Sequence, residues 1–230
     1  GCPYLCSFCL SALDKTVRYF DDEIIFNQME NLINAGVKKF KFVDRTFNLK
    51  PGRMKTLMEW LSQFIGSEFH FEVVGDILTP DILRFLETVP PGMFQFEIGI
   101  QTTDESVQES IDRKQNNQKL FDTIKTLLVQ DRIHFHCDLI FGLPGENMGK
   151  ILNSFREVLS LRPHELQLGF LKFLPGAPIK NTIRSHKYQY QSTPPYELIS
   201  NKDLSAEEVD YLKKFADIFD RFYNSKRFRF

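Results

Sequence analysis

Residues 133–174 have the sequence IHFHCDLIFGLPGENMGKILNSFREVLSLRPHELQLGFLKFL. Residues 133–141 are predicted to form a strand, and the turn from Gly142 to Gly145 closes it. Residues 147–161 have the periodicity of a helix, and residues 165–174 are predicted to form another strand. Because a helix separates the two strands, this stretch predicts a parallel pair with a helical crossover.

The same alternation of strands and helices continues toward the N-terminus. Further strands are predicted at residues 38–44, 69–74 and 94–100, and helices at residues 21–35, 53–64, 79–88 and 118–130. A capping box, Thr102 with Glu105, predicts the start of another helix. We therefore expect an α/β fold, a partial (β/α)6 parallel barrel over residues 1–175. Residues 176–230 form a C-terminal helical extension in this prediction.

Three of the four cysteines lie within the first nine residues, as Cys2, Cys6 and Cys9. The C-x3-C-x2-C spacing places three thiolates in one short loop. Such a loop suits a 4Fe-4S cluster, with one iron left for another ligand. It also suits a structural zinc site with a fourth ligand elsewhere, such as Cys137 or a histidine. The loop leads straight into a helix, so we expect the first barrel strand to precede Gly1.

Strand alternation separates these two interpretations. If Asp138 points into the barrel, then His136 and His134 do so too, and Cys137 faces the helices. Cys137 is then a small buried hydrophobe and no fourth ligand. His136 is a candidate for contact with substrate, or a core histidine bonded to Asp138 or to backbone.

Composition excludes several classes of protein. The 230 residues include 29 basic and 30 acidic side chains, and this balance argues against general affinity for nucleic acid. No run of 18 apolar residues exists, so we expect no membrane span, and no signal peptide is apparent. A hydrophobic content of 42% with 23 phenylalanines argues against intrinsic disorder.

These motifs resemble the radical S-adenosylmethionine (radical SAM) superfamily, in which C-x3-C-x2-C follows the first strand and an aromatic residue such as Phe8 precedes the last cysteine. The resemblance implies a 4Fe-4S cluster on Cys2, Cys6 and Cys9. It also implies that this cluster, when reduced, cleaves SAM to a 5′-deoxyadenosyl radical. Residues 97–102 (EIGIQT) and 138–145 (DLIFGLPG) are similar to motifs of the coproporphyrinogen-oxidase-like and cobalamin-dependent branches.

The resemblance also implies a set of SAM-binding residues, which lie at the ends of predicted strands or in the loops that follow. Arg113 offers a fork of donors for a carboxylate, and Gln101 and Asp138 can bind ribose hydroxyls. The full predicted set is Phe8, Asp44, Glu72, Gln101, Arg113, Asp138 and Gly142. Backbone around Phe8 and Gly142 is expected to meet adenine.

The leading functional hypothesis is cobalamin-dependent methyl transfer, with a cobalamin-binding domain outside this chain. Residues 166–176, 194–198 and 223–228 resemble a cobalamin-dependent subgroup with a C-terminal region of unassigned function. The alternatives are a non-methylating radical SAM reaction (dehydrogenation, rearrangement or decarboxylation) and a zinc-binding or electron-transfer module. Position 11 is Ser, which departs from the coproporphyrinogen oxidase signature. An oxygen-sensitive cluster implies the cytoplasm and a low-potential electron donor, flavodoxin or ferredoxin.

Overall fold

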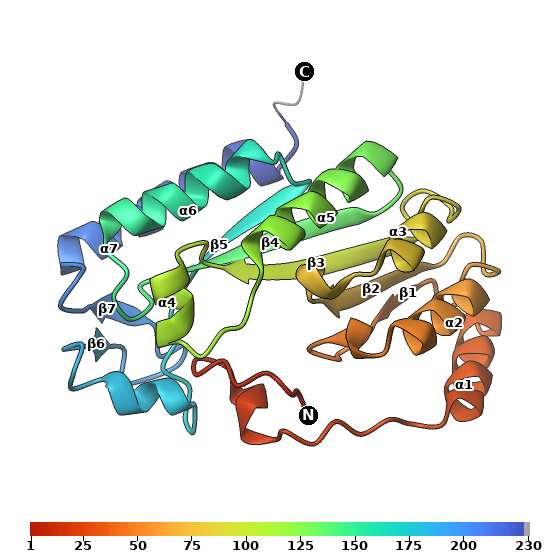
Figure 1. Cartoon of the computed structure of the whole chain (residues 1–230), viewed down its shortest axis with the longest axis horizontal. Coiled ribbons are helices and arrows are strands. Elements are labelled where there is room, and N and C mark those ends of the chain that lie inside the picture. The colour runs from red at the N-terminus through yellow and green to blue at the C-terminus, as the bar shows by residue number, and fades with distance from the viewer. Residues whose placement is uncertain (228–230) are drawn as a thin grey trace. The chain divides into compact units, whose positions relative to one another are not determined.

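The computed structural model describes residues 1–227 of the chain. Five strands form one parallel sheet in the order β1-β2-β3-β4-β5 (Figure 1). Their bounds are β1 Lys39–Lys41, β2 Glu68–Val73, β3 Phe94–Gln101, β4 His134–Phe141 and β5 Glu165–Phe170. The α/β class and the five predicted parallel strands are thereby confirmed.

Helices connect these strands, and a small hairpin follows them. The helices are α1 Asp22–Asn34, α2 Pro51–Leu61, α3 Pro80–Leu86, α4 Glu105–Ser110, α5 Asn117–Gln130, α6 Met148–Ser160 and α7 Ala206–Phe219. Strands β6 (Gln189–Tyr190) and β7 (Leu198–Ser200) pair in an antiparallel hairpin. Short helical turns lie at Leu10–Leu13, Phe47–Leu49, Gly75–Ile77, Pro178–Thr182 and Asp220–Asn224.

The chain divides into two compact units. Unit 1 comprises residues 1–15, 100–115 and 136 onward, and unit 2 comprises residues 16–99 and 116–135. The cysteine loop, the end of β3, most of β4 and the whole C-terminal region therefore belong to unit 1. Strands β1 and β2 and helices α1, α2, α3 and α5 belong to unit 2.

Unit 2 has a phenylalanine-rich core on one face of its strands. Phe69 and Phe71 of β2 are fully buried, and so are Phe94 and Phe96 of β3. The Phe71 ring centroid lies 5.8 Å from that of Phe94 and 6.3 Å from that of Phe96. Residues between them along each strand are only half-buried, because successive side chains point to opposite faces.

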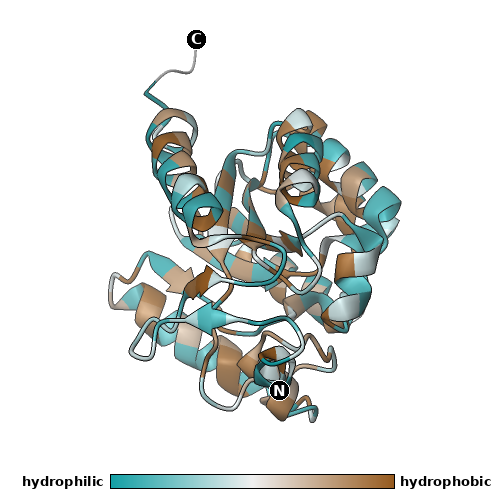
Figure 2. Ribbon diagram, turned by 90° about the vertical axis from the view of Figure 1, so that its left-hand side faces the viewer, coloured by the Kyte–Doolittle hydropathy of each residue, from teal (hydrophilic) through white to brown (hydrophobic). Residues whose placement is uncertain are grey.

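Unit 1 packs its C-terminal helix against α6. The ring centroid of Phe155 on α6 lies 5.1 Å from that of Phe215 and 5.2 Å from that of Phe219 on α7. Hydrophobic and hydrophilic bands alternate along α7 (Figure 2), as expected of an amphipathic helix. Beyond α7, Asn224 bonds both the N–H and the carbonyl of Leu166 on β5, at 3.0 and 3.1 Å. The extension is therefore fastened to the strands of its own unit.

Three local predictions are wrong and one is confirmed. Helix α4 is capped by Asp104, which accepts from Val107 N, and not by the predicted box at Thr102. Strand β1 spans only Lys39–Lys41, and β5 ends at Phe170 rather than at residue 174. The capping box at Ser205 and Glu208, which opens α7, is present with both hydrogen bonds. Of the predicted motif at residues 223–228, Phe228 lies outside the described residues.

Within residues 1–227, every helix is too short or too polar to cross a membrane.

Candidate functional site

The cysteine loop folds back on itself at the start of unit 1. Cys9 N donates to Cys6 O at 3.0 Å, and Ser11 N donates to Cys9 Sγ at 3.4 Å. Cys2 N donates to Asp14 O at 3.0 Å, so the ends of the loop are tied together. All three cysteines are thiols outside any disulfide. The loop therefore presents three sulfur ligands from nine residues, as the C-x3-C-x2-C spacing predicts.

Cys6 lies next to a guanidinium group from another segment of unit 1. Burial raises the pKa of the Cys6 thiol, and the adjacent Arg113 guanidinium opposes that shift. The Cys9 and Cys2 thiols raise the pKa of Cys6 further. Arg113 Nη1 lies 3.9 Å from Cys6 Sγ. Three free thiols in one short loop fit the donor set of an iron–sulfur cluster with one open position.

Segments distant in sequence hold this loop in place. Ser7 N donates to Ile111 O at 2.9 Å, and Ile179 N donates to Ser7 O at 2.7 Å. Both backbone groups of Ser7 are therefore fixed by unit 1. Ser7 Oγ is buried without a hydrogen-bond partner among the described residues, and Phe8 next to it is half-buried.

Gln101 ends β3 in a conformation that few non-glycine residues adopt. Its φ is 69°, and its Oε1 is buried without a hydrogen-bond partner among the described residues. A left-handed backbone and an unsatisfied buried acceptor both cost free energy, and such costs gather at functional sites. The predicted role of Gln101 as a ligand for a hydroxyl group fits this acceptor.

Arg113 is oriented by a glutamine that sequence analysis missed. Its Nε and Nη2 donate to Gln115 Oε1 at 3.0 and 2.8 Å. Gln115 Nε2 in turn donates to Thr102 O at 3.4 Å, directly after Gln101. A glutamine two residues after an arginine carries no signal in sequence. Gln115 therefore links two predicted SAM-binding positions, Arg113 and the end of β3.

Strand β4 confirms the predicted alternation. Cys137 is fully buried, while His136 and Asp138 beside it are half-buried. Burial raises the pKa of the Cys137 thiol far above its ordinary value. Cys137 is therefore a core residue, and its neighbours on β4 belong to the polar face.

The turn after β4 is built around a buried carboxyl group. Glu146 accepts from Gly142 N at 2.8 Å and from Leu143 N at 3.2 Å. Ser110 Oγ donates to Pro144 O at 2.9 Å on the same turn. Glu146 was not predicted, although an acidic residue four positions after a strand-ending glycine could have suggested a ligand for the turn's own amides.

Burial raises the pKa of Glu146 from 4.5 to about 8. The amides of Leu143 and Gly142 and the Thr102 hydroxyl lower this pKa, and the Asp104 carboxylate raises it. Because the folded chain holds this proton more tightly than the unfolded chain, the free energy of unfolding falls as pH rises from about 4.5 to about 8.

Glu146→Gln is therefore expected to flatten the pH dependence of stability in this window. The loss between about pH 5.5 and about pH 8, on the order of 1–3 kcal/mol in the parent, shrinks in the variant because glutamine does not titrate. Urea denaturation at both pH values measures it. The matched control is Glu109→Gln, which changes an exposed carboxylate of the same unit. Identical pH profiles for the parent and Glu146→Gln would contradict the prediction.

Gly142 permits close packing at the same turn. Its φ is 87°, and a Cβ there would overlap Leu198 Cδ2, whose side chain is fully buried. Gly145 has a φ of 76° but nothing within 4 Å of an added Cβ. We expect Gly142→Ala to lower the free energy of unfolding by about 3 kcal/mol and Gly145→Ala by about 1 kcal/mol. Denaturant titration of both variants tests this, and equal losses would remove the packing explanation.

The two remaining predicted residues, Asp44 and Glu72, lie in unit 2. Glu72 is paired with Arg45, whose Nη1 lies 3.1 Å from Oε1, and Asp44 is exposed.

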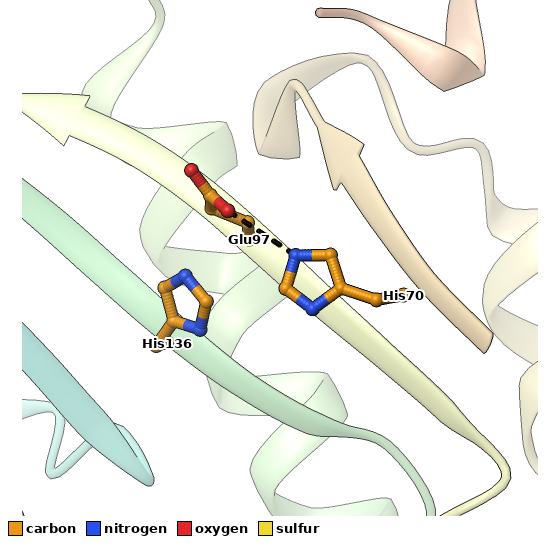
Figure 3. Close-up of side chains that lie close together, drawn as sticks. All are labelled: His70, Glu97 and His136. Atoms are coloured by element: carbon orange, nitrogen blue, oxygen red, sulfur yellow. Dashed lines mark hydrogen bonds and ion pairs between the residues drawn. The ribbon is translucent and has the colours of Figure 1, made fainter. Parts of the chain in front are cut away.

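Also on the polar face of β1–β3, His70 Nε2 lies 3.1 Å from Glu97 Oε2 (Figure 3). Lys41 Nζ lies 3.5 Å from the same oxygen. Sequence analysis did not single out the cluster that His70, Glu97 and Lys41 form on this surface.

Comparison with known families identifies the superfamily to which this fold belongs. Residues 1–158 match the model of the radical SAM superfamily. The chain belongs to the radical SAM superfamily. It is therefore an enzyme of that superfamily, whose members use a 4Fe-4S cluster and SAM. Residues 184–230 match a second family, described as a protein of unknown function (DUF4080).

Relatives of this radical SAM domain are found in two branches. The chain is 26% identical to the cobalamin-dependent radical SAM methyltransferase TokK from Streptomyces tokunonensis, over 91% of the chain and 32% of TokK. It therefore spans about a third of the length of that relative. The methyltransferase TsrM from Kitasatospora setae superposes with a TM-score of 0.70 at 14% identity, over 85% of this chain and 39% of TsrM. Coproporphyrinogen III oxidase (HemN) from Escherichia coli superposes with a TM-score of 0.63 at 20% identity, over 96% of this chain and 50% of HemN.

Proposed function

We propose that this chain holds a 4Fe-4S cluster on Cys2, Cys6 and Cys9 and cleaves SAM, with cobalamin-dependent methyl transfer as the reaction of the whole protein. The observation that carries this proposal is a short loop, tied by backbone hydrogen bonds, that holds three free thiols beside Arg113. When bound, a reduced cluster supplies the electron that breaks a carbon–sulfur bond of SAM.

The residues of unit 1 have separate tasks in this proposal. The three cysteines hold the cluster, and Arg113, oriented by Gln115, binds the SAM carboxylate. Gln101 brings a buried acceptor that a ribose hydroxyl would satisfy. Asp138, Phe8 and the backbone at Gly142 complete the SAM site, while Asp44 and Glu72 stay predictions in unit 2.

The methyl-transfer assignment is supported by the likeness to TokK over 91% of the chain. It requires a cobalamin-binding domain elsewhere in the protein and a low-potential electron donor such as flavodoxin or ferredoxin. A non-methylating radical SAM reaction is the second candidate, and the likeness to HemN supports it. The reducing chemistry of such a cluster points to the cytoplasm. The zinc alternative loses support because the core position of Cys137 does not suit a fourth ligand.

Anaerobic reconstitution of the full-length protein tests the proposal. Iron and sulfide are added, the protein is reduced with dithionite, and SAM is supplied. We expect about four irons per chain and release of 5′-deoxyadenosine. Binding of one zinc without SAM cleavage would contradict the proposal. Methyl transfer is tested separately by adding methyl-labelled SAM and hydroxocobalamin, since label must pass to cobalamin if cobalamin is the methyl carrier.

A further inference from the structure

The DUF4080 region contacts the turn that follows β4, within unit 1. Tyr188, which is buried, donates its hydroxyl hydrogen to Gly142 O at 3.0 Å. Asn201 Nδ2 lies 3.5 Å from the same carbonyl oxygen. Two residues, 46 and 59 positions further along the chain, therefore satisfy the carbonyl group of Gly142.

Tyr188 and Asn201 are themselves held firmly. Burial raises the pKa of the Tyr188 phenol well above its ordinary value, so the hydroxyl stays a neutral donor at physiological pH. The Tyr188 ring packs on Phe173 with centroids 4.8 Å apart. Asn201 Oδ1 accepts from Asp203 N and Leu204 N, both at 2.8 Å. Both donors to Gly142 O are thus pre-organised.

Backbone hydrogen bonds tie the same region to the end of β4. Leu171 N donates to Phe141 O at 3.0 Å, and Leu198 N donates to Leu171 O at 2.9 Å. Backbone hydrogen bonds therefore connect Leu198, the first residue of β7, through Leu171 to Phe141 at the end of β4. The buried Leu198 side chain covers the Gly142 Cα, as the space around that glycine shows.

Both backbone groups of Gly142, its N–H and its carbonyl, are consequently held by hydrogen bonds. Its N–H donates to Glu146, and its carbonyl accepts from Tyr188. Two buried side chains, one from the turn itself and one from the DUF4080 region, set the direction of these backbone groups. A ligand that lies against this turn would meet a rigid backbone, and rigid partners lose less entropy on binding.

We propose that the DUF4080 region positions the Gly142–Glu146 turn for the adenosyl part of SAM, with Tyr188 as the main positioning residue. This inference rests on the proposed function, because it takes the turn to be a SAM contact. It assigns a role in cofactor binding to a region that matches a family of unknown function, and it separates that role from cluster binding by the cysteines.

Tyr188→Phe in the full-length, reconstituted protein tests the inference. The variant keeps the ring but removes the donor to Gly142 O. We expect SAM to bind about tenfold more weakly, since a buried carbonyl loses its main partner. The iron content is expected to be unchanged. Affinity for L-methionine, which lacks the adenosyl part, is also expected to be unchanged, as followed through perturbation of the cluster's electron paramagnetic resonance spectrum.

Tyr223→Phe is the matched control. Tyr223 also donates its hydroxyl hydrogen to a backbone carbonyl, that of Pro163 at 2.6 Å, beside β5 rather than at the turn. The variant Tyr223→Phe removes a hydrogen bond of the same kind from the same unit. We therefore expect a comparable loss of stability and an unchanged affinity for SAM. If Tyr188→Phe does not fold, Asn201→Ala, which removes the second donor to Gly142 O, takes its place in the same assay.

The outcomes separate this inference from the proposed function. If the parent protein, with its cluster loaded, binds no SAM, the proposed function fails. If the parent binds SAM and Tyr188→Phe binds it equally well, only the positioning role is overturned. Weaker binding of both SAM and methionine would also overturn it, because a general structural defect does not distinguish the two ligands.

Discussion

Cys6→Ala is expected to abolish cluster binding and, with it, release of 5′-deoxyadenosine from SAM. Cys6 is buried, and it shares one short loop with the free thiols of Cys2 and Cys9. A 4Fe-4S cluster with three protein ligands has none to spare, so alanine leaves a second iron open. Iron and sulfide content after anaerobic reconstitution, with the visible absorbance of the cluster, gives the direct measurement. Cys2→Ala and Cys9→Ala are expected to give the same loss.

Cys137→Ala is the matched control for this series. Cys137 is a thiol of the same chain, but it is fully buried in the core beside Phe135 and Leu139. The variant should bind iron as the parent does and lose about 1 kcal/mol of stability for the small cavity. Normal cluster content in all three loop variants would disprove the ligand assignment, and loss of the cluster in Cys137→Ala alone would restore Cys137 as a ligand.

The alternation of strands and helices was enough to predict the parallel sheet, and the two-residue period of a strand was enough to predict the orientation of β4. Alternating burial follows from strand geometry alone, so Cys137 could be assigned to the core and Asp138 to the other face. The predicted cap at Ser205 was also confirmed because both partners of a capping box lie within one turn of helix. Strand alternation and helix caps depend on residues that are close together in the chain, so both can be predicted from the sequence alone.

Contacts between distant segments could not be predicted in the same way. Asp104 caps α4 because the Thr102 hydroxyl already accepts from Asp104 N and lies beside Ser154 on α6. Three supporting side chains bond to backbone groups or to Arg113, namely those of Gln115, Glu146 and Tyr188. Their residue types alone do not predict these contacts. The motifs therefore predict some residues of the candidate site, whereas the residues that support them are found only in the structure.

Arg113→Met is expected to weaken SAM binding by about tenfold to a hundredfold while the cluster stays in place. Arg113 lies beside the cysteine loop, with Nη1 3.9 Å from Cys6 Sγ, and is held there by Gln115. A guanidinium bonded to a carboxylate contributes about 1.5–3 kcal/mol, which methionine of similar length does not replace. Titration of the reconstituted protein with SAM, with iron content measured in parallel, separates ligand binding from cluster binding.

Arg221→Met is the matched control, since Arg221 makes an exposed ion pair with Asp217 one helical turn away. Exposed pairs contribute little, so SAM affinity and stability should match the parent protein. Gln115→Ala should have a smaller effect in the same direction as Arg113→Met, because it removes the support of the guanidinium and not its charge. Unchanged SAM affinity in Arg113→Met would exclude Arg113 from the SAM site. Loss of iron in this variant would instead place the guanidinium among the supports of the cluster, since its charge also acts on Cys6.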